Sequence, residues 1–465
     1  MNTPSRRRGV LFAVAATQFA APFMISSVGI VLPAIGRDFQ ASGVALSMVE
    51  SVFLGVNAMF LLAFGRASDL MGRNWIFTLG LIIFCLSTVA LGFSPTIHAM
   101  IAIRALQALG GAMQVSTGLA ILMDVYPSEE RGRVLGISLA CIYLGLSTGP
   151  FMGGYLADIL GWRWLFFLCV VPCLAALVQA FRALKWDFRR LEVPFDYAGA
   201  LASMVCIGLL LSGGANMDTD YGFPLLGGSL AALAVFLRIE SRRENPLLDL
   251  GLFKGNVDFS FGNLLQFLNY SATFGLTFLM SLFLQLGHGM TPLHAGTILV
   301  VQPLVQSVLS PLCGRLADRY PPEPLVTAGM LLSMAGLGWA STFDAATSMA
   351  SVIVMLAVMG VGIALFVSPN MKTIMGSVPP KSYGVATAIT GQMRIIGMTF
   401  SMVAISMVIS VIIGDRVLDT DVFDLFNRVV KVVLGGGCVV GALGMLLSLA
   451  ASRRKRRAAR KSVEP

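Results

Sequence analysis

The chain has 465 residues, of which 56% are hydrophobic and only 12% are charged, and its mean hydropathy is +0.81. Soluble domains carry about 25% charged residues, so this composition excludes an ordinary soluble protein. The formal net charge of +9 is explained by membrane topology, as described below, and does not indicate binding to nucleic acid.

Apolar runs of about 20 residues recur along the chain between short polar interruptions, and a helix of that length crosses a hydrocarbon core of about 30 Å. The pattern predicts an all-α polytopic membrane protein. The first run is too long for the core of a signal peptide and leads directly into a second span, so we interpret it as a retained helix. We predict fourteen transmembrane helices, near residues 10–35, 44–64, 75–93, 99–123, 134–157, 164–182, 197–214, 223–237, 261–285, 295–312, 325–343, 349–371, 385–413 and 429–451.

The basic residues indicate the orientation, because Lys and Arg are retained on the cytoplasmic side of a membrane. With the N-terminus inside, the cytoplasmic segments hold most of the 33 basic residues, including the run RRKRRAARK that starts at Arg453. We therefore expect a multi-pass protein of the cell (inner) membrane with both termini cytoplasmic. The basic cytoplasmic tail, 453–465, is expected to contact anionic membrane lipids.

Two charged residues lie inside the early spans, where hydrocarbon makes charge costly: Glu50 in span 2 and Arg104 in span 4. Both lie about 8 to 9 Å below the outer boundary at 1.5 Å per residue, so they can meet. We expect this pair to bind and release a proton. The alternative is that Glu50, near the outer end of its span, simply reaches water. Asn57 shares the face of Glu50 and supports a polar interior surface.

A short loop sequence occurs twice, as GRASDLMGR from Gly65 and as GRLADRY from Gly314, after spans 2 and 10. Transporters are often built from such repeated halves, with the substrate site between them at mid-membrane. The repeat predicts two six-helix bundles and a two-helix insertion. We expect an N-terminal bundle over 1–190, two inserted transmembrane helices and a cytoplasmic connection over 191–250, and a C-terminal bundle over 251–452.

The charges of the first loop fit a gate. Asp69 can accept hydrogen bonds from a helix N-terminus, while Arg66 and Arg73 can hold carboxylates or lipid phosphates, so the contact can latch one state. The alternative is that these charges only set topology, a role for which the arginines alone would be sufficient. We expect gating by residues of both loops, namely Gly65, Arg66, Asp69, Gly72, Arg73, Gly314, Arg315 and Asp318.

Span 5 contains a regular series of glycines within LGLSTGPFMGG. Gly145, Gly149 and Gly153 share one helix face and permit close helix approach, while Pro150 removes a backbone hydrogen bond and favours a bend. Tight packing alone is the alternative, and it does not exclude a role in alternating access. Gly154 extends this series of small residues.

Span 9 has a polar stripe over nearly its whole length, because polar residues follow one another in steps of three or four. Interhelical hydrogen bonding is the alternative to a cavity lining. Arg394, about 13 Å into span 13, either faces substrate or pairs with a carbonyl or carboxylate group. The predicted cavity residues are Asn57, Gln107, Asn263, Gln266, Asn269, Tyr270, Thr273, Gln302, Gln306 and Arg394.

The ordered set of motifs resembles the major facilitator superfamily, and specifically its fourteen-helix drug:proton antiporter branch. The two loops match the family's loop signature, Arg104 and Gln107 match its helix 4 signature, and the span 5 glycines match its antiporter signature. The resemblance implies a gate at the loops and a cavity role for span 9. One departure concerns helix 1, where the branch commonly carries an acidic residue and this chain has Met24.

We expect a secondary active transporter that exports small amphipathic organic compounds or drugs in exchange for protons and functions as a monomer. With two interior arginines and one clear carboxylate, a neutral or anionic metabolite, exported or imported, is the alternative; a membrane sensor is a further one, disfavoured because no soluble signalling domain is visible. No Ser-His-Asp arrangement, metal cluster or phosphate loop is visible. We therefore expect no enzyme activity, no cofactor and no metal site.

Overall fold

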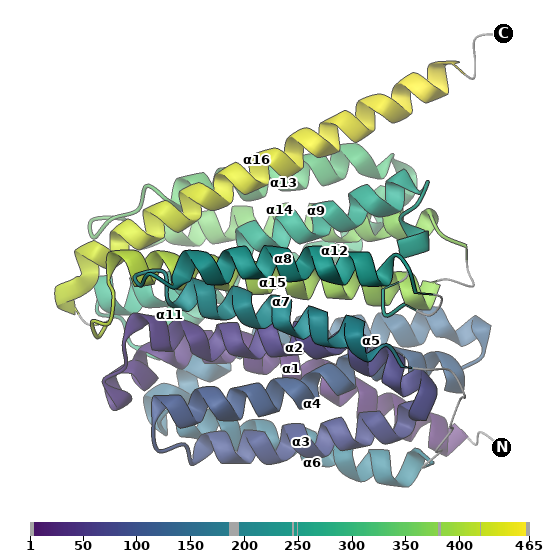
Figure 1. Ribbon diagram of the computed structural model, residues 1–465. Helices are drawn as coiled ribbons and strands as arrows, with labels where there is room; N and C mark the ends of the chain where they lie inside the picture. The colour runs from purple at the N-terminus through teal and green to yellow at the C-terminus, as the bar shows by residue number, and fades with distance from the viewer. Residues whose placement is uncertain are drawn as a thin grey trace.

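The computed structural model describes residues 4–185, 195–243, 246–248, 250–379, 383–418 and 420–461. Within these ranges the regular structure is helical, and one isolated bridge pairs Ser42 with Val417. The helices run side by side in one bundle, and both chain ends are marked at the same end of it (Figure 1). We call this end the terminal face and the opposite end the far face. The predicted all-α membrane architecture is confirmed.

The first six helices pack against one another and form what we call the first helix group. Helix α1 contacts both α5 and α6, while α4 contacts α2 and α3. Side-chain caps begin two of the helices, because the Ser42 and Thr96 hydroxyls accept the N–H groups of Ala45 and Ala99. The bounds are α1 Pro4–Phe39, α2 Gly43–Met71, α3 Arg73–Gly92, α4 Ile97–Val125, α5 Ser128–Ile159 and α6 Arg163–Ala183.

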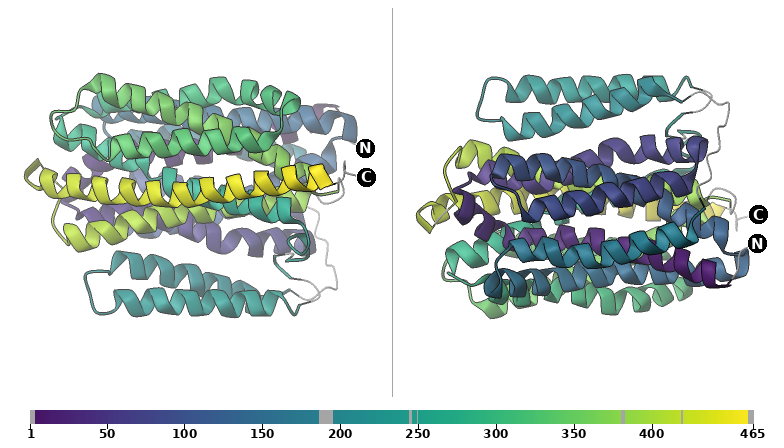
Figure 2. Two further views of the ribbon diagram at one scale, coloured as in Figure 1. Left: turned by 90° about the horizontal axis from the view of Figure 1, so that it is seen from above. Right: turned by 90° about the horizontal axis from the view of Figure 1, so that it is seen from below.

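Helices α7 (Tyr197–Ala215) and α8 (Gly222–Glu240) form an antiparallel pair, which we call the hairpin. It lies at one edge of the bundle in both views of Figure 2. Helix α7 contacts α2 and α15, and Leu211 packs over Gly55 of α2. The hairpin therefore touches both neighbouring sets of helices.

The remaining helices pack together as the second helix group, in which α13 contacts α14 and α16, and α9 contacts α15 and α16. A π-helical turn at Phe283–Gly287 follows α10, and 3-10 turns occupy Leu250–Leu252 and Thr420–Val422. The bounds are α9 Val257–Thr273, α10 Leu276–Leu282, α11 Pro292–Leu299, α12 Val301–Arg319, α13 Pro322–Ala340, α14 Met349–Gly376, α15 Tyr383–Ile412 and α16 Phe423–Lys461.

In the described part of the chain, 13 helical segments are long and apolar enough to cross a membrane, and α13, at 19 residues, corresponds to the remaining predicted span. Two predicted spans are interrupted. Span 9 breaks at Gly275, whose N–H donates to the Ser401 hydroxyl of α15 (3.0 Å). Span 10 breaks after Leu299, because Pro303 has no N–H to give the Leu299 carbonyl.

The two helix groups are joined by hydrogen bonds at the far face. The Ser47 hydroxyl of α2 lies 2.8 Å from the Ser406 hydroxyl of α15. Gln285, in the π-helical turn, donates to the Ile30 carbonyl of α1 (2.9 Å). These contacts hold the groups together at the far face.

Candidate functional site

Glu50 and Arg104 form a buried ion pair between α2 and α4. The Arg104 Nη2 and Glu50 Oε2 atoms are 3.6 Å apart, and the side chains are 0% and 3% exposed. The expectation that these two residues meet is confirmed. Arg104 also donates to the Val49 carbonyl (3.2 Å) and to Gln107 Oε1 (2.8 Å), and Gln107 in turn donates to the Thr88 hydroxyl (2.8 Å). The guanidinium is therefore held by α2 and α4, and its partner Gln107 reaches α3.

The carboxylate of this pair is less well bonded than the guanidinium. Neither oxygen of Glu50 accepts a hydrogen bond, although both are buried. The Arg104 guanidinium lies over the Phe53 ring, 4.4 Å from its centroid. An ionised carboxylate that is buried without hydrogen-bond donors is costly. Protonation of Glu50 lowers this cost, and it breaks no hydrogen bond because neither oxygen accepts one. Phe53, one turn after Glu50 on α2, was the residue of this site that the sequence did not single out.

The pair lies next to the contact between the helix groups. Glu50 directly precedes Ser51, whose hydroxyl is 3.4 Å from that of Ser406. Ser47 and Ser51 are separated by one turn and both contact α15, whereas Glu50 faces α4. A shift of α2 that accompanies a change of charge at Glu50 therefore also moves the serines that touch α15.

Asn57 lies on α2, seven residues after Glu50, and like Glu50 it faces α4. It is buried, and its Nδ2 atom would be 3.1 Å from a Cβ at Gly111. Its Oδ1 atom has no hydrogen-bond partner. Asn57 thus extends the buried polar surface between α2 and α4.

A second polar cluster lies where both helix groups meet. Tyr270 of α9 lies beside Arg394 of α15, Tyr143 of α5 lies beside Ser310 of α12, and Tyr143 is near enough to Tyr270 and Arg394 to interact with them electrostatically. In the described part of the chain, no carboxylate lies within ion-pair distance of Arg394. The cavity residues predicted from the sequence did not include Tyr143, although a tyrosine in the middle of span 5 could have indicated it.

The other residues of the span 9 stripe are buried against neighbouring helices. Asn370 of α14 donates to Gln266 Oε1 (3.2 Å), and Asn263 donates to the Phe259 carbonyl of its own helix. Thr273 likewise bonds within α9, to the Asn269 carbonyl. On α12, Gln306 is buried and Gln302 is half-buried. The structure therefore brings Tyr270 and Arg394 together but turns Gln266 towards α14.

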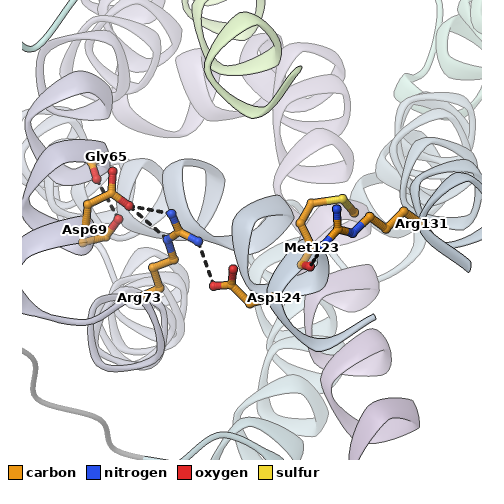
Figure 3. A network of polar contacts seen from close by, with 7 residues as sticks. Gly65, Asp69, Arg73, Met123, Asp124 and Arg131 are labelled. Carbon is orange, nitrogen blue, oxygen red and sulfur yellow. Dashed lines mark hydrogen bonds and ion pairs between the residues drawn. The ribbon is translucent and has the colours of Figure 1, made fainter. Parts of the chain in front are cut away.

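At the terminal face, the first loop forms a charge network that Figure 3 shows from close by. Arg73 donates to Asp69 Oδ1 through Nε (3.0 Å) and Nη2 (2.8 Å), and to Asp124 Oδ2 through Nη1 (2.7 Å). Gly72 joins α2 to α3 with a φ of 113°, a value that favours glycine. Arg66 is half-buried beside this network. Asp124, in the last turn of α4, was missed because a single acid at a helix end has no motif.

The second loop is tied to its own group in a related way. Lys372 of α14 lies 2.9 Å from Asp318 Oδ1 and donates to the Ala317 carbonyl (2.6 Å). Gly314 has open space around it, and Arg315 is exposed. The structure places both predicted loop aspartates in the last turn of a helix, Asp69 in α2 and Asp318 in α12. Asp69 is fastened through Arg73 to the end of α4, and Asp318 directly to Lys372 near the end of α14.

The glycines of α5 lie against two helices. A Cβ at Gly145, Gly149 or Gly153 would collide with the backbone or serines of α1. On another face, a Cβ at Gly154 would lie 2.9 Å from the Pro292 carbonyl carbon, and one at Gly296 would meet the Pro150 carbonyl group. Helix α5 is therefore packed closely between α1 of its own group and α11 of the other.

Asp69→Asn is expected to leave expression and fold intact but to slow turnover by about twofold to fivefold, the range of an exposed ion pair. The asparagine keeps an acceptor for Arg73 but loses the charge that latches the loop. Initial transport rates in vesicles measure the effect. Asp158→Asn, which changes an exposed carboxylate at the far end of α5, is the control. An Asp69→Asn rate equal to wild type contradicts the latch.

Comparison with known proteins agrees with this architecture. The model of the Major Facilitator Superfamily matches residues 14–398. The chain is 28% identical over 382 residues to the riboflavin transporter RibZ of Clostridioides difficile, covering 81% of this chain and 82% of that protein. It is 29% identical over 393 residues to the multidrug resistance protein Stp of Mycobacterium tuberculosis, covering 82% and 72%.

Among solved structures, the fold is similar to a bacterial homolog of the human lysosomal transporter Spinster in an inward-facing, unoccupied conformation. The TM-score is 0.68 at 17% sequence identity, over 97% of this chain and 98% of that one. The helical bundle and the family match over most of the chain indicate the same architecture. This chain belongs to the Major Facilitator Superfamily and is a multi-pass membrane transporter.

Proposed function

We propose that this transporter exports small amphipathic organic compounds in exchange for protons, by alternating access. The buried pair of Glu50 and Arg104 beside the serine contact with α15 is the observation that carries the proposal. Similarity to proteins named for multidrug resistance supports export. The protein acts as a monomer within the lipid bilayer, in the cell membrane.

In the proposed cycle, a proton neutralises Glu50 and removes its attraction to Arg104. Arg104 keeps its bond to Gln107 of its own helix, so the guanidinium stays with α4, while α2 retains only the bond from Arg104 to the Val49 carbonyl and is freer to move. For exchange, the proton binds while the far face is open, and the movement of α2 that follows lets Ser47 and Ser51 meet Ser406 and close the far face. The reverse step releases the proton when the other side is open.

The two helix groups, with the proposed domain limits 1–190 and 251–452, move against each other in this cycle, and 191–250 forms the insertion. The terminal face is cytoplasmic, in accord with the basic residues of its loops such as Arg66, Arg73 and Arg315. In this proposal the far-face contacts close the substrate site towards the outside. The networks around Asp69 and Asp318 control opening and closing at the terminal face.

The central cluster of Arg394, Tyr270 and Tyr143 is the proposed substrate contact, with the buried amides of α9 behind it. Its hydroxyl groups and tyrosine rings fit a planar organic molecule with an acceptor group. Since no described carboxylate pairs with Arg394, a neutral or anionic substrate is the second candidate. The relative named as a riboflavin transporter is consistent with this second candidate.

Uptake into inside-out vesicles under an imposed pH gradient tests the proposal. Ethidium, riboflavin and fluorescein serve as cationic, neutral and anionic probes. A proton-coupled exporter accumulates at least one of them only when the vesicle interior is acidic. Equal accumulation of every probe with and without the pH gradient would contradict proton coupling.

Arg394→Gln is expected to reduce uptake of an anionic or neutral probe by about tenfold or more, because a hydrogen bond to a charged group contributes about 1.5–3 kcal/mol. Concentration-dependent uptake rates show whether binding is weakened. Arg238→Gln, at an exposed position on α8, is the matched control. If Arg394→Gln leaves uptake of every probe unchanged, Arg394 is not a substrate contact.

A further inference from the structure

Two carboxylates are buried together at the end of the hairpin nearest the terminal face. Asp196 caps the N-terminus of α7, and Glu240 is the last residue of α8. The residues are only 6% and 2% exposed. Carboxylates are rarely buried to this extent unless they are paired, so their surroundings need an explanation.

In each carboxylate, one oxygen accepts a hydrogen bond from a backbone N–H group. Asp196 Oδ1 accepts the Gly199 N–H (3.0 Å) and lies 3.5 Å from Arg243 Nε. Glu240 Oε2 accepts the Leu248 N–H (3.0 Å). The other two oxygens, Asp196 Oδ2 and Glu240 Oε1, are buried and have no hydrogen-bond partner.

The two unpartnered oxygens point at the same place, above Gly199. A Cβ at Gly199 would lie 2.6 Å from Glu240 Oε1 and 2.8 Å from Asp196 Oδ2, so the oxygens are separated by no more than the sum of those distances. Any residue larger than glycine at 199 would collide with both side chains. Gly199 therefore makes room for the facing carboxylates.

Two ionised carboxylates this close repel each other, and one proton held by the pair removes that repulsion. Among the described residues, Arg243 is the other charged group that faces the pair, and its single positive charge balances the one negative charge that remains. A metal ion fits less well, because it would add positive charge beside Arg243 and find only two free oxygens.

We propose that Asp196 and Glu240 share one bound proton, and that this proton fastens the chain leading to α9 against the hairpin. The fastening passes through the bond from Leu248 to Glu240. Leu248 belongs to the same buried hydrophobic cluster as Phe259 of α9 and Ile374 of α14, so the site connects the hairpin to the second helix group. Loss of the proton leaves two facing negative charges and weakens that connection.

The melting temperature of the purified protein in detergent, followed from mildly acidic to alkaline pH, tests the site without substrate or gradient. The wild type is expected to lose several degrees as the pH rises and the proton leaves. Glu240→Gln and Asp196→Asn each replace the proton with an amide N–H, so each is expected to flatten the profile. The double variant should flatten it no further, because the first amide already abolishes the shared proton.

Asp220→Asn removes an exposed carboxylate at the opposite end of the hairpin and is expected to keep the wild-type slope. A wild-type slope in both Glu240→Gln and Asp196→Asn overturns the proposal. So does stabilisation of the wild type by Mg²⁺ or Ca²⁺ that chelation reverses and either variant abolishes, because the site would then hold a metal ion.

Infrared spectroscopy provides a second readout if the hairpin variants fail to fold. In a Glu50→Gln background, we expect a protonated-carboxyl band at neutral pH that disappears under alkaline conditions. Absence of this band overturns the shared proton. Since neither measurement involves transport, failure here leaves the proposed export function untouched, and the reverse also holds.

Discussion

Glu50→Gln is expected to abolish accumulation of substrate driven by a pH gradient, down to the level of vesicles without a gradient. Glutamine keeps the shape of the side chain beside Arg104 but cannot gain or lose a proton. The variant should still bind substrate and exchange it across the membrane, because the Arg394 cluster is unchanged. Parallel measurements of gradient-driven uptake and of exchange between labelled and unlabelled substrate separate the two activities.

The matched control for this experiment is Asp38→Asn, which removes a carboxylate near the far face that pairs with Arg163 (2.7 Å). It is expected to keep gradient-driven uptake. If Glu50→Gln transports like wild type, coupling belongs to a boundary acid such as Asp38 or Asp258, or protons are not coupled at all. Arg104→Ala should also impair coupling, since it leaves Glu50 buried without its ion-pair partner.

Gly154→Leu is expected to reduce transport to background. A side chain at this position collides with the backbone of α11 at Pro292 and forces α5 and α11 apart. The far face could then no longer close, and the cycle would stop in the state that is open there. Transport rate, together with the reactivity of a cysteine placed at Ser406 towards a membrane-impermeant thiol reagent, measures both consequences.

Gly136→Leu is the control within the same helix, because a Cβ at Gly136 meets nothing within 4 Å. It should fold and transport like wild type. Size-exclusion chromatography of both variants distinguishes a blocked cycle from a misfolded protein. Normal transport by correctly folded Gly154→Leu would mean that close contact of α5 with α11 is not required.

Hydropathy predicted the number and order of the helices because a bilayer forces each spanning segment to satisfy its own backbone. The Glu50 and Arg104 pair was predictable for a similar reason, since isolated charges in hydrocarbon need partners. The breaks at Gly275 and after Leu299 were not predicted. The first depends on a hydroxyl of α15 that lies far away in sequence.

The site was predicted less completely because helix rotation is set by packing. The polar stripe of α9 was visible in the sequence, but only its neighbours decide that Gln266 faces Asn370 while Tyr270 faces Arg394. Tyr143 reaches that cluster from the other helix group. No periodicity within one span reveals such a contact.

The helices of the hairpin are short, so their fit to the membrane depends on bilayer thickness. Helices α7 and α8 have 19 residues each, whereas α2 and α4 have 29. At 1.5 Å per residue the hairpin helices are about 28 Å long, close to a hydrocarbon core of about 30 Å, while the longer helices project beyond it. A thicker bilayer therefore leaves the hairpin helices too short to span it, so the bilayer must thin locally around them, and transport should depend on acyl-chain length.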